Sequence, residues 1–267
     1  MARGVSAAPA LRALIFDVDG TLAETERDGH RVAFNRAFAA LGLPWQWDDA
    51  TYGALLRVAG GYERLLSFLA GQSDAPPIAA EREALARAIH QRKNAEFSAL
   101  VAQGGIASRP GVRRLIDACA GQGVLLAVAT TTGRANLDAL FPHLFGADWP
   151  QRFAALVCAE DAPRKKPDPQ VYRIALARLG IAAPAAIAIE DSPAGLAAAR
   201  AADIACLITR SMYFADADFS GAAAVLDDLD AAPNWPCASP RVDMDALRAL
   251  HALHAGWARR VDPCGSE

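Results

Sequence analysis

Short runs of apolar residues alternate along the chain with longer stretches in which apolar positions recur every three or four residues. The short runs predict buried strands, which lie at 11–16, 124–129, 153–158, 186–189 and, as the last strand, 204–209. The longer stretches have the spacing of helices and follow the strands in turn. Strands that alternate with helices predict an α/β fold whose core is a Rossmann-like, doubly wound parallel sheet.

The stretch between the first two predicted strands has a different pattern. Residues 22–107 show helical spacing throughout and contain no strand-like run. We therefore expect an all-helical cap domain at 22–107, inserted into an α/β core formed by residues 1–21 and 108–230. The remaining residues, 231–267, begin as a proline-containing linker and continue as a helix near 244–257.

The composition narrows the class of protein. The chain has 267 residues, of which 53% are hydrophobic and 21% charged, and its formal net charge is −3. These values are typical of a soluble globular protein, and they give no electrostatic reason to expect nucleic acid or a membrane as a partner. No apolar run has membrane-spanning length, the N-terminus lacks a signal-peptide layout, and the five cysteines have no C-x-x-C spacing. We expect a cytoplasmic monomer.

The first predicted strand ends in two acids, Asp17 and Asp19, followed by Gly20 and Thr21. Ligands of open α/β sheets bind at the carboxyl ends of strands, and alternation along an extended chain would point both acids to one side. Two close carboxylates repel unless a cation joins them or they share a proton, and they can divide labour as nucleophile and general acid. The alternative is a polar turn that caps the next helix.

Three further polar groups follow later strands or open helices. Thr130 could hold a phosphate at a helix N-terminus or could simply cap that helix. Lys166 could offer its ammonium to a phosphate or could be a solvated surface lysine. The pair Glu190 and Asp191 could complete a Mg²⁺ site with Asp17, or could be a helix start before Pro193.

These four motifs, in this order on an α/β pattern, resemble the haloacid dehalogenase-like phosphatases. The resemblance implies that Asp17 is the nucleophile that forms an aspartyl-phosphate, and that Asp19 protonates the leaving alcohol and then activates water. It also implies that Thr130 and Lys166 hold the phosphoryl group.

The metal site is implied in the same way. In proteins of this superfamily, the positions that match Asp17, the backbone carbonyl of Asp19 and Asp191 would hold Mg²⁺, and Glu190 would be a further ligand or would support one.

A closer resemblance, to the CbbY-type proteins, rests on LIFDVDGTLAETE at 14–26, AFN at 33–35, ATTT at 129–132 and EDS at 190–192. CbbY-type proteins are phosphatases linked to Rubisco in the Calvin cycle, and they hydrolyse the inhibitor xylulose-1,5-bisphosphate. The resemblance therefore implies a small phosphorylated sugar as substrate. Two alternatives stay open: a phosphosugar mutase like the related β-phosphoglucomutases, and a non-catalytic protein that binds phosphosugars on the same fold.

The helical segment and the stretch just after the second predicted strand contain the candidates for substrate recognition. Arginine binds phosphate through a bidentate fork, so Arg57, Arg64 and Arg134 are candidates for a second, distal phosphate. The alternative for these arginines is a solvated helix face. Tyr62 stands where the family commonly has lysine. The other candidate substrate-binding residues are Glu24, His30, Gly61, Thr131 and Thr132.

Overall fold

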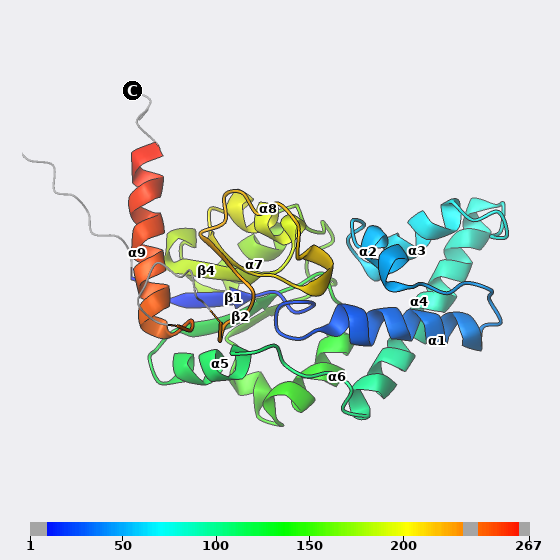
Figure 1. Ribbon diagram of the computed structural model, residues 1–267, viewed down its shortest axis with the longest axis horizontal. Coiled ribbons are helices and arrows are strands. Elements are labelled where there is room, and N and C mark those ends of the chain that lie inside the picture. Colours follow the sequence, from blue (N-terminus) through cyan, green and yellow to red (C-terminus); the bar gives the residue numbers. More distant parts are fainter. Residues whose placement is uncertain (1–9, 232–239, 262–267) are drawn as a thin grey trace, which may run out of the picture.

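A six-stranded, fully parallel sheet forms the centre of the computed structural model, which describes residues 10–231 and 240–261. The strand order is β3-β2-β1-β4-β5-β6 (Figure 1). The strands are β1 (Ala13–Phe16), β2 (Leu125–Ala129), β3 (Ala155–Val157), β4 (Ala186–Glu190), β5 (Ala205–Thr209) and β6 (Ala224–Leu226). The predicted doubly wound parallel sheet is confirmed. The expectation that the strand at 204–209 is the last one was wrong, because the three-residue strand β6 pairs with β5 at the edge of the sheet.

Helices cover both faces of the sheet. They are α5 (Val112–Ala120), α6 (Arg134–Phe145), α7 (Gln170–Leu179), α8 (Pro193–Ala201) and α9 (Met244–Val261). Alternate residues of β1 face the two layers: Leu14 and Phe16 pack in the cluster with α5, α6 and α9, whereas Ala13 and Ile15 pack in the cluster with α7 and α8. This burial on two sides explains why β1 reads as a continuous apolar run.

Between β1 and β2 the chain forms a separate group of helices, called here the helical insert (residues 22–107). It contains a π-helical turn, η1 (Glu26–Arg31), followed by α1 (Val32–Ala40), α2 (Asp49–Leu55), α3 (Gly61–Ala70) and α4 (Ala79–Ala102). These helices lie at one end of the molecule, beyond the carboxyl end of β1 (Figure 1). The insert has its own apolar cluster, in which Phe34, Phe38, Trp47 and Tyr52 are almost fully buried.

The chain enters and leaves the helical insert at one place. Ala23 forms an antiparallel bridge with Ser108, and Arg109 N–H donates to Leu22 O at 2.9 Å. The buried guanidinium of Arg109 then donates to backbone carbonyls of Gly20 and of Thr209 at the end of β5. These bonds hold the junction between insert and sheet against the carboxyl ends of the strands, where the acids lie.

The C-terminal helix α9 starts at Met244, where helical spacing predicted a helix. Its buried residues Leu247 and Leu250 join the cluster on the α5 face. The predicted linker prolines Pro233 and Pro236 lie outside the described residues. Among the described helices, none is both long and apolar enough to cross a membrane.

Candidate active site

Three acids meet where the neighbouring strands β1 and β4 end. Asp17 N–H donates to Ile189 O at 3.0 Å, so the residue after β1 lies level with the end of β4, where Glu190 and Asp191 follow. Each of the three acids offers a carboxylate oxygen within 4.8 Å of the other two, and all three are buried. Burial raises the pKa of Asp17 to about 7 and that of Asp191 well above its usual range. Buried carboxylates whose charge is this unfavourable suit a hard divalent cation, so the residues present fit the metal that the resemblance implies.

Lys166 provides positive charge in the same cluster. Its Nζ lies 2.6 Å from Asp17 Oδ1 and 2.6 Å from Glu190 Oε1, and the Tyr172 hydroxyl donates to the same Glu190 oxygen at 2.6 Å. Burial alone would lower the pKa of Lys166, but the two carboxylates outweigh it and raise that pKa above its usual range. The lysine is therefore not a solvated surface residue but a fixed ammonium beside Asp17.

Asp19 lies on the side of the site that faces the helical insert. Its Oδ1 accepts a hydrogen bond from the Thr25 hydroxyl and lies 3.0 Å from His30 Nε2, while its Oδ2 accepts from the Thr132 hydroxyl. Burial would raise the pKa of Asp19, but attraction to His30 and the hydrogen bonds from His30, Thr132 and Thr25 lower it well below its usual range. In this arrangement, without a ligand, Asp19 is an ionised carboxylate.

Thr130 lies at the end of β2, next to β1. Its side chain is buried, and its hydroxyl oxygen accepts the Thr132 N–H at 3.1 Å. That bond fixes the turn that follows β2 but does not cap α6, whose N-cap is Gly133 without a side-chain cap bond, so the capping alternative was wrong for Thr130. The hydroxyl keeps its proton for another acceptor, such as a phosphate oxygen.

Two cavities meet at this edge of the sheet. The first cavity, of about 290 Å³, is lined by Asp17, Lys166 and Asp191 from the core. The second cavity, of about 190 Å³, is lined by His30 and Lys93 of the helical insert among others. Residues that line both cavities are Asp19, Glu26, Gly60, Arg64 and Thr131. Together the cavities extend from the acids to the helices of the insert.

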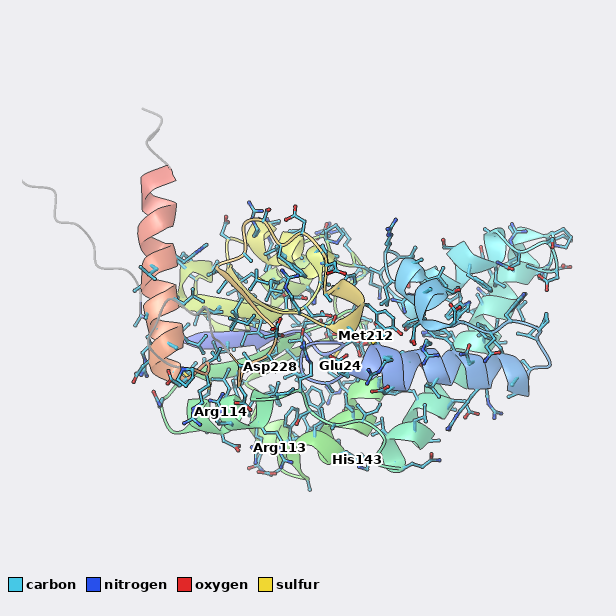
Figure 2. The ribbon with its side chains drawn as sticks, viewed as in Figure 1. Glu24, Arg113, Arg114, His143, Met212 and Asp228 are labelled. Atoms are coloured by element: carbon cyan, nitrogen blue, oxygen red, sulfur yellow. The ribbon has the colours of Figure 1, made fainter. Side chains whose placement is uncertain are left out.

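Most of the predicted substrate-binding residues line these cavities. Glu24 and Arg57 line the first, and the second is lined by His30, Gly61, Tyr62 and Thr132. Glu24 also pairs with Arg109 at 3.2 Å, where the insert joins the core (Figure 2). Glu24 therefore both lines the first cavity and forms part of the junction between the insert and the core.

Arg64 and Arg134 differ sharply. Arg64 is 6% exposed, and its guanidinium donates to the Tyr52 hydroxyl at 3.0 Å and faces both cavities. A solvated helix face is therefore excluded for Arg64. Arg134 is half-exposed at the start of α6, pairs with Asp138 at 2.8 Å, and lines neither cavity. The structure does not bring Arg134 to the site.

Sequence reasoning missed Lys93 on α4. Its side chain is only 3% exposed, its Nζ lies 5.3 and 5.4 Å from the ring centres of Phe34 and Phe97, and it lines the second cavity. Among the described residues it forms no ion pair, and its ammonium makes a 3.5 Å hydrogen bond to Asn94 Oδ1. Burial lowers the pKa of Lys93 to about 8. A signal existed: Lys93 occupies a position in the apolar stripe that runs through Ile89 and Phe97.

Comparisons with known proteins agree with this geometry. Residues 11–203 match the family model of haloacid dehalogenase-like hydrolases. The chain is 45% identical over 247 residues to protein CbbY of Cupriavidus necator, covering 90% of this chain and 97% of that protein. It is 43% identical over 222 residues to CbbY of Rhodobacter capsulatus, covering 83% and 95%. The crystal structure of CbbY from Rhodobacter sphaeroides with phosphate superimposes with a TM-score of 0.76 at 42% identity, covering 82% of this chain and 94% of that one.

The parallel sheet, the acids that follow β1 and β4, and the matching family model together identify the chain as a hydrolase. The chain belongs to the haloacid dehalogenase-like hydrolase family. Within that family it is a phosphatase of the CbbY type, which confirms the resemblance read from the motifs at 14–26, 129–132 and 190–192.

Proposed function

We propose that this chain is a Mg²⁺-dependent phosphatase that hydrolyses xylulose-1,5-bisphosphate through an aspartyl-phosphate on Asp17. The observation that carries the proposal is the position of Asp17, which lines the first cavity beside the Lys166 ammonium and close to the acids Glu190 and Asp191. The substrate is supported by a 42% identical CbbY variant from Rhodobacter sphaeroides, whose crystal structure is a complex with xylulose-1,5-bisphosphate.

Asp17 must be ionised to attack phosphorus, and its surroundings provide for this. Lys166 attracts the negative charge that the nucleophile and the phosphoryl group bring together. Asp17, Glu190 and Asp191 would hold Mg²⁺, with the backbone carbonyl of Asp19 as a further ligand by resemblance. When bound, the ion supplies positive charge that stabilises the ionised acids and the phosphoryl oxygens.

Asp19 carries the proton. An oxygen of Asp17 forms a bond to phosphorus while the ester P–O bond breaks, and the leaving alkoxide takes a proton from Asp19, which binds that proton when the negatively charged phosphoryl group lies beside it. Asp19 then accepts a proton from the water that attacks the aspartyl-phosphate, which releases phosphate and restores Asp17. The hydrogen bonds from Thr25 and Thr132 favour the carboxylate, which is the form needed in the second step.

The second cavity supplies a place for the second phosphate. Lys93 and Arg64 are both buried cations that line it, and Lys165 lines it too. A buried ammonium without a carboxylate partner is unfavourable until an anion joins it. A bisphosphate that reaches from Asp17 into the second cavity would provide that anion.

The alternatives have less support. A non-catalytic phosphosugar-binding protein would not need the intact set of Asp17, Asp19, Lys166 and the acidic pair. Two β-phosphoglucomutase structures similar to this chain, from Thermotoga maritima and Clostridium difficile, are 24% and 18% identical to it, so they support the shared fold and not the mutase reaction. We also propose that the protein acts in the Calvin cycle and is located in the cytoplasm. We propose further that it is a monomer and that residues 22–107 form one cap domain.

A phosphate-release assay tests the proposed function. Wild type and Asp17→Asn would be compared on xylulose-1,5-bisphosphate, β-glucose-1-phosphate and a generic phosphomonoester, with Mg²⁺ and after treatment with EDTA. We expect the bisphosphate to be the best substrate, with activity lost in EDTA and lowered by at least about 10⁴-fold in Asp17→Asn, since the amide is a poor nucleophile and ligand. Isomerisation of β-glucose-1-phosphate without phosphate release would favour the mutase. Undiminished turnover in folded Asp17→Asn would refute covalent catalysis.

A further inference from the structure

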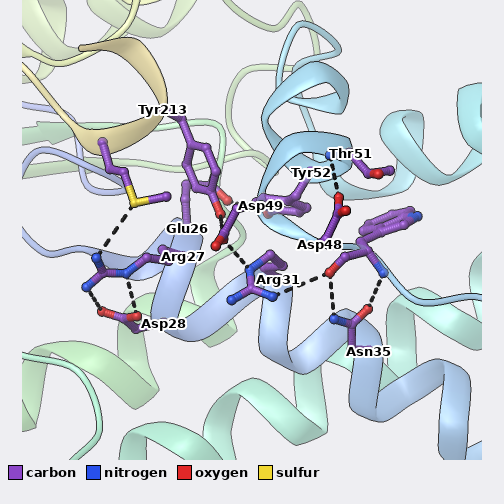
Figure 3. A network of polar contacts seen from close by, with 12 residues as sticks. Glu26, Arg27, Asp28, Arg31, Asn35, Asp48, Asp49, Thr51, Tyr52 and Tyr213 are labelled. Atoms are coloured by element: carbon purple, nitrogen blue, oxygen red, sulfur yellow. Dashed lines mark hydrogen bonds and ion pairs between the residues drawn. The ribbon is translucent and has the colours of Figure 1, made fainter.

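One loop of the core reaches across to the helical insert. After β5 the chain forms a short 3₁₀ turn, η4 (Met212–Phe214), and the Tyr213 hydroxyl donates to Asp49 Oδ1 at 2.9 Å (Figure 3). Asp49 is the first residue of α2, and its carboxylate also pairs with Arg31 at 2.9 Å. The hydrogen bond thus joins the core to two helical elements of the insert.

The ring of Tyr213 fits against the same helix. It packs on Tyr52 with a centroid separation of 5.6 Å and an interplanar angle of 62°. A Cβ added at Gly53 would lie 3.1 Å from Tyr213 Cδ1, so glycine in the middle of α2 gives the ring room to approach. The contact therefore has an apolar part and a separate polar part.

Tyr52 connects Tyr213 to residues that line the site. Its hydroxyl donates to Glu26 Oε2 and accepts from Arg64 at 3.0 Å, and Glu26 and Arg64 line both cavities. Tyr213 itself lies in the wall of the first cavity, which Asp17 also lines. A continuous path of contacts runs from the core loop through Tyr213 and Tyr52 to Arg64.

We propose that Tyr213 is a positioning residue that latches the helical insert over the site through Asp49 and so holds Arg64 in place for the substrate. The latch deepens the proposed function but does not depend on the identity of the sugar. We call the enzyme closed when the insert lies against the core, and open when it does not. Tyr213 raises the ratio of closed to open enzyme, because its bond to Asp49 exists only in the closed state.

A distance measurement on the free protein tests the latch without any turnover. Labels introduced as non-canonical amino acids at Ala80 and Ala177 place one probe on the exposed start of α4 and one on α7. Residue 80 lies at the end of α4 away from the junction, so a swing of the insert moves it far. We expect Tyr213→Phe, which keeps the ring, to lower the ratio of closed to open distances about fivefold.

Asp74→Ala is the matched control. Asp74 is an exposed carboxylate of the insert that accepts from Trp45 Nε1 and touches no core residue in the described contacts. This variant should leave the distances unchanged. Identical distance distributions in wild type and Tyr213→Phe would overturn the proposal, and so would an equal shift in Asp74→Ala.

Kinetics separate a positioning role from a purely structural one. In Tyr213→Phe and Asp49→Ala we expect KM for the best substrate to rise about two- to fivefold with kcat unchanged, because the closed fraction falls while the reacting groups stay in place. The double variant should be no worse than the stronger single variant, since both remove the same bond. A loss confined to kcat, or fully additive effects, would refute the latch. If no sugar phosphate is turned over, the proposed function fails while the distance result still decides the latch.

Discussion

Two lysines are buried to nearly the same extent in different parts of the molecule, and they have opposite environments. Lys166 of the core is 6% exposed and lies 2.6 Å from two carboxylates, and its pKa is raised. Lys93 of the helical insert is 3% exposed and packs between two phenylalanine rings, and burial lowers its pKa to about 8.

The difference separates two kinds of binding site. In the core, Lys166 is already paired with Asp17 and Glu190 before any ligand arrives, which is the preorganisation that phosphoryl transfer needs. In the insert, the charge of Lys93 has no carboxylate partner among the described residues, so a substrate anion is the natural partner. The two lysines therefore allow the chemistry and the recognition to be tested separately.

Among the variants that test this comparison, Lys166→Met should have the largest effect. The substitution leaves Asp17 and Glu190 buried without their shared counter-charge. Removing one partner of a buried ion pair costs about 3–5 kcal/mol, and the loss of transition-state charge stabilisation should lower kcat by about 10³-fold. Urea denaturation of the metal-free protein and single-turnover assays would measure both changes. A variant as stable and as active as wild type would show that Lys166 is not the counter-charge of the site.

Lys93→Met should have the opposite effect on stability. Removing a buried charge that lacks a partner should raise the free energy of unfolding by about 1–3 kcal/mol, while the methionine fills a similar volume. The same variant should lower kcat/KM for a bisphosphate about ten- to a hundredfold, and should change that for a generic phosphomonoester much less. Equal losses on both substrates would mean that Lys93 does not bind a distal phosphate.

The ionisation of Lys93 should also affect how kcat/KM and stability depend on pH. Below pH 8 its ammonium is charged and can bind an anion, so kcat/KM for the bisphosphate should fall as the pH rises through about 8. Stability should change in the other direction: between about pH 8 and 10.5 the unfolded chain holds the proton that the folded chain has lost, so this group's contribution to stability rises with pH. The Lys93→Met variant should lack both changes, and a pH profile identical to that of wild type would contradict the assignment.

The smallest effect is expected for Arg134→Ala. Its guanidinium is engaged with Asp138 on an exposed helix surface, where such a pair contributes roughly 0.3–0.5 kcal/mol. We expect kcat/KM for a bisphosphate to change less than about twofold. Arg64→Ala, assayed in parallel, should lose about tenfold or more. A comparable loss in Arg134→Ala would mean that this arginine reaches the substrate after all.

The sequence predicted the sheet well because β1 and β4 are buried on both faces and therefore read as unbroken apolar runs. The edge strand β6 was missed because it has only three residues and its first two are half-buried, so neither length nor pattern distinguished it from a loop. The acids were predicted to meet because they follow apolar strands, and the carboxyl ends of parallel strands lie on the same side of an open α/β sheet.

Contacts that depend on how helices pack could not be predicted in the same way. Arg64 and Arg134 look alike in the sequence, and only the packing of α3 and α6 decides that one is buried and the other half-exposed. Lys93 lies within an apolar stripe of α4, and a prediction from hydrophobicity alone places a lysine at such a position on the surface. Tyr213 is more than 160 residues from Asp49, and no local pattern indicates their contact.

The junction at Ala23 and Ser108 has a consequence for how such a protein can diversify. Because the two ends of residues 22–107 are paired with each other, a segment of another length could be grafted between them without disturbing the register of β1 and β4. Arg109 would have to remain with the sheet, since it binds the carbonyls of Gly20 and Thr209 from that junction. A new specificity could then be acquired by exchanging one module, while the reaction that it serves is inherited unchanged.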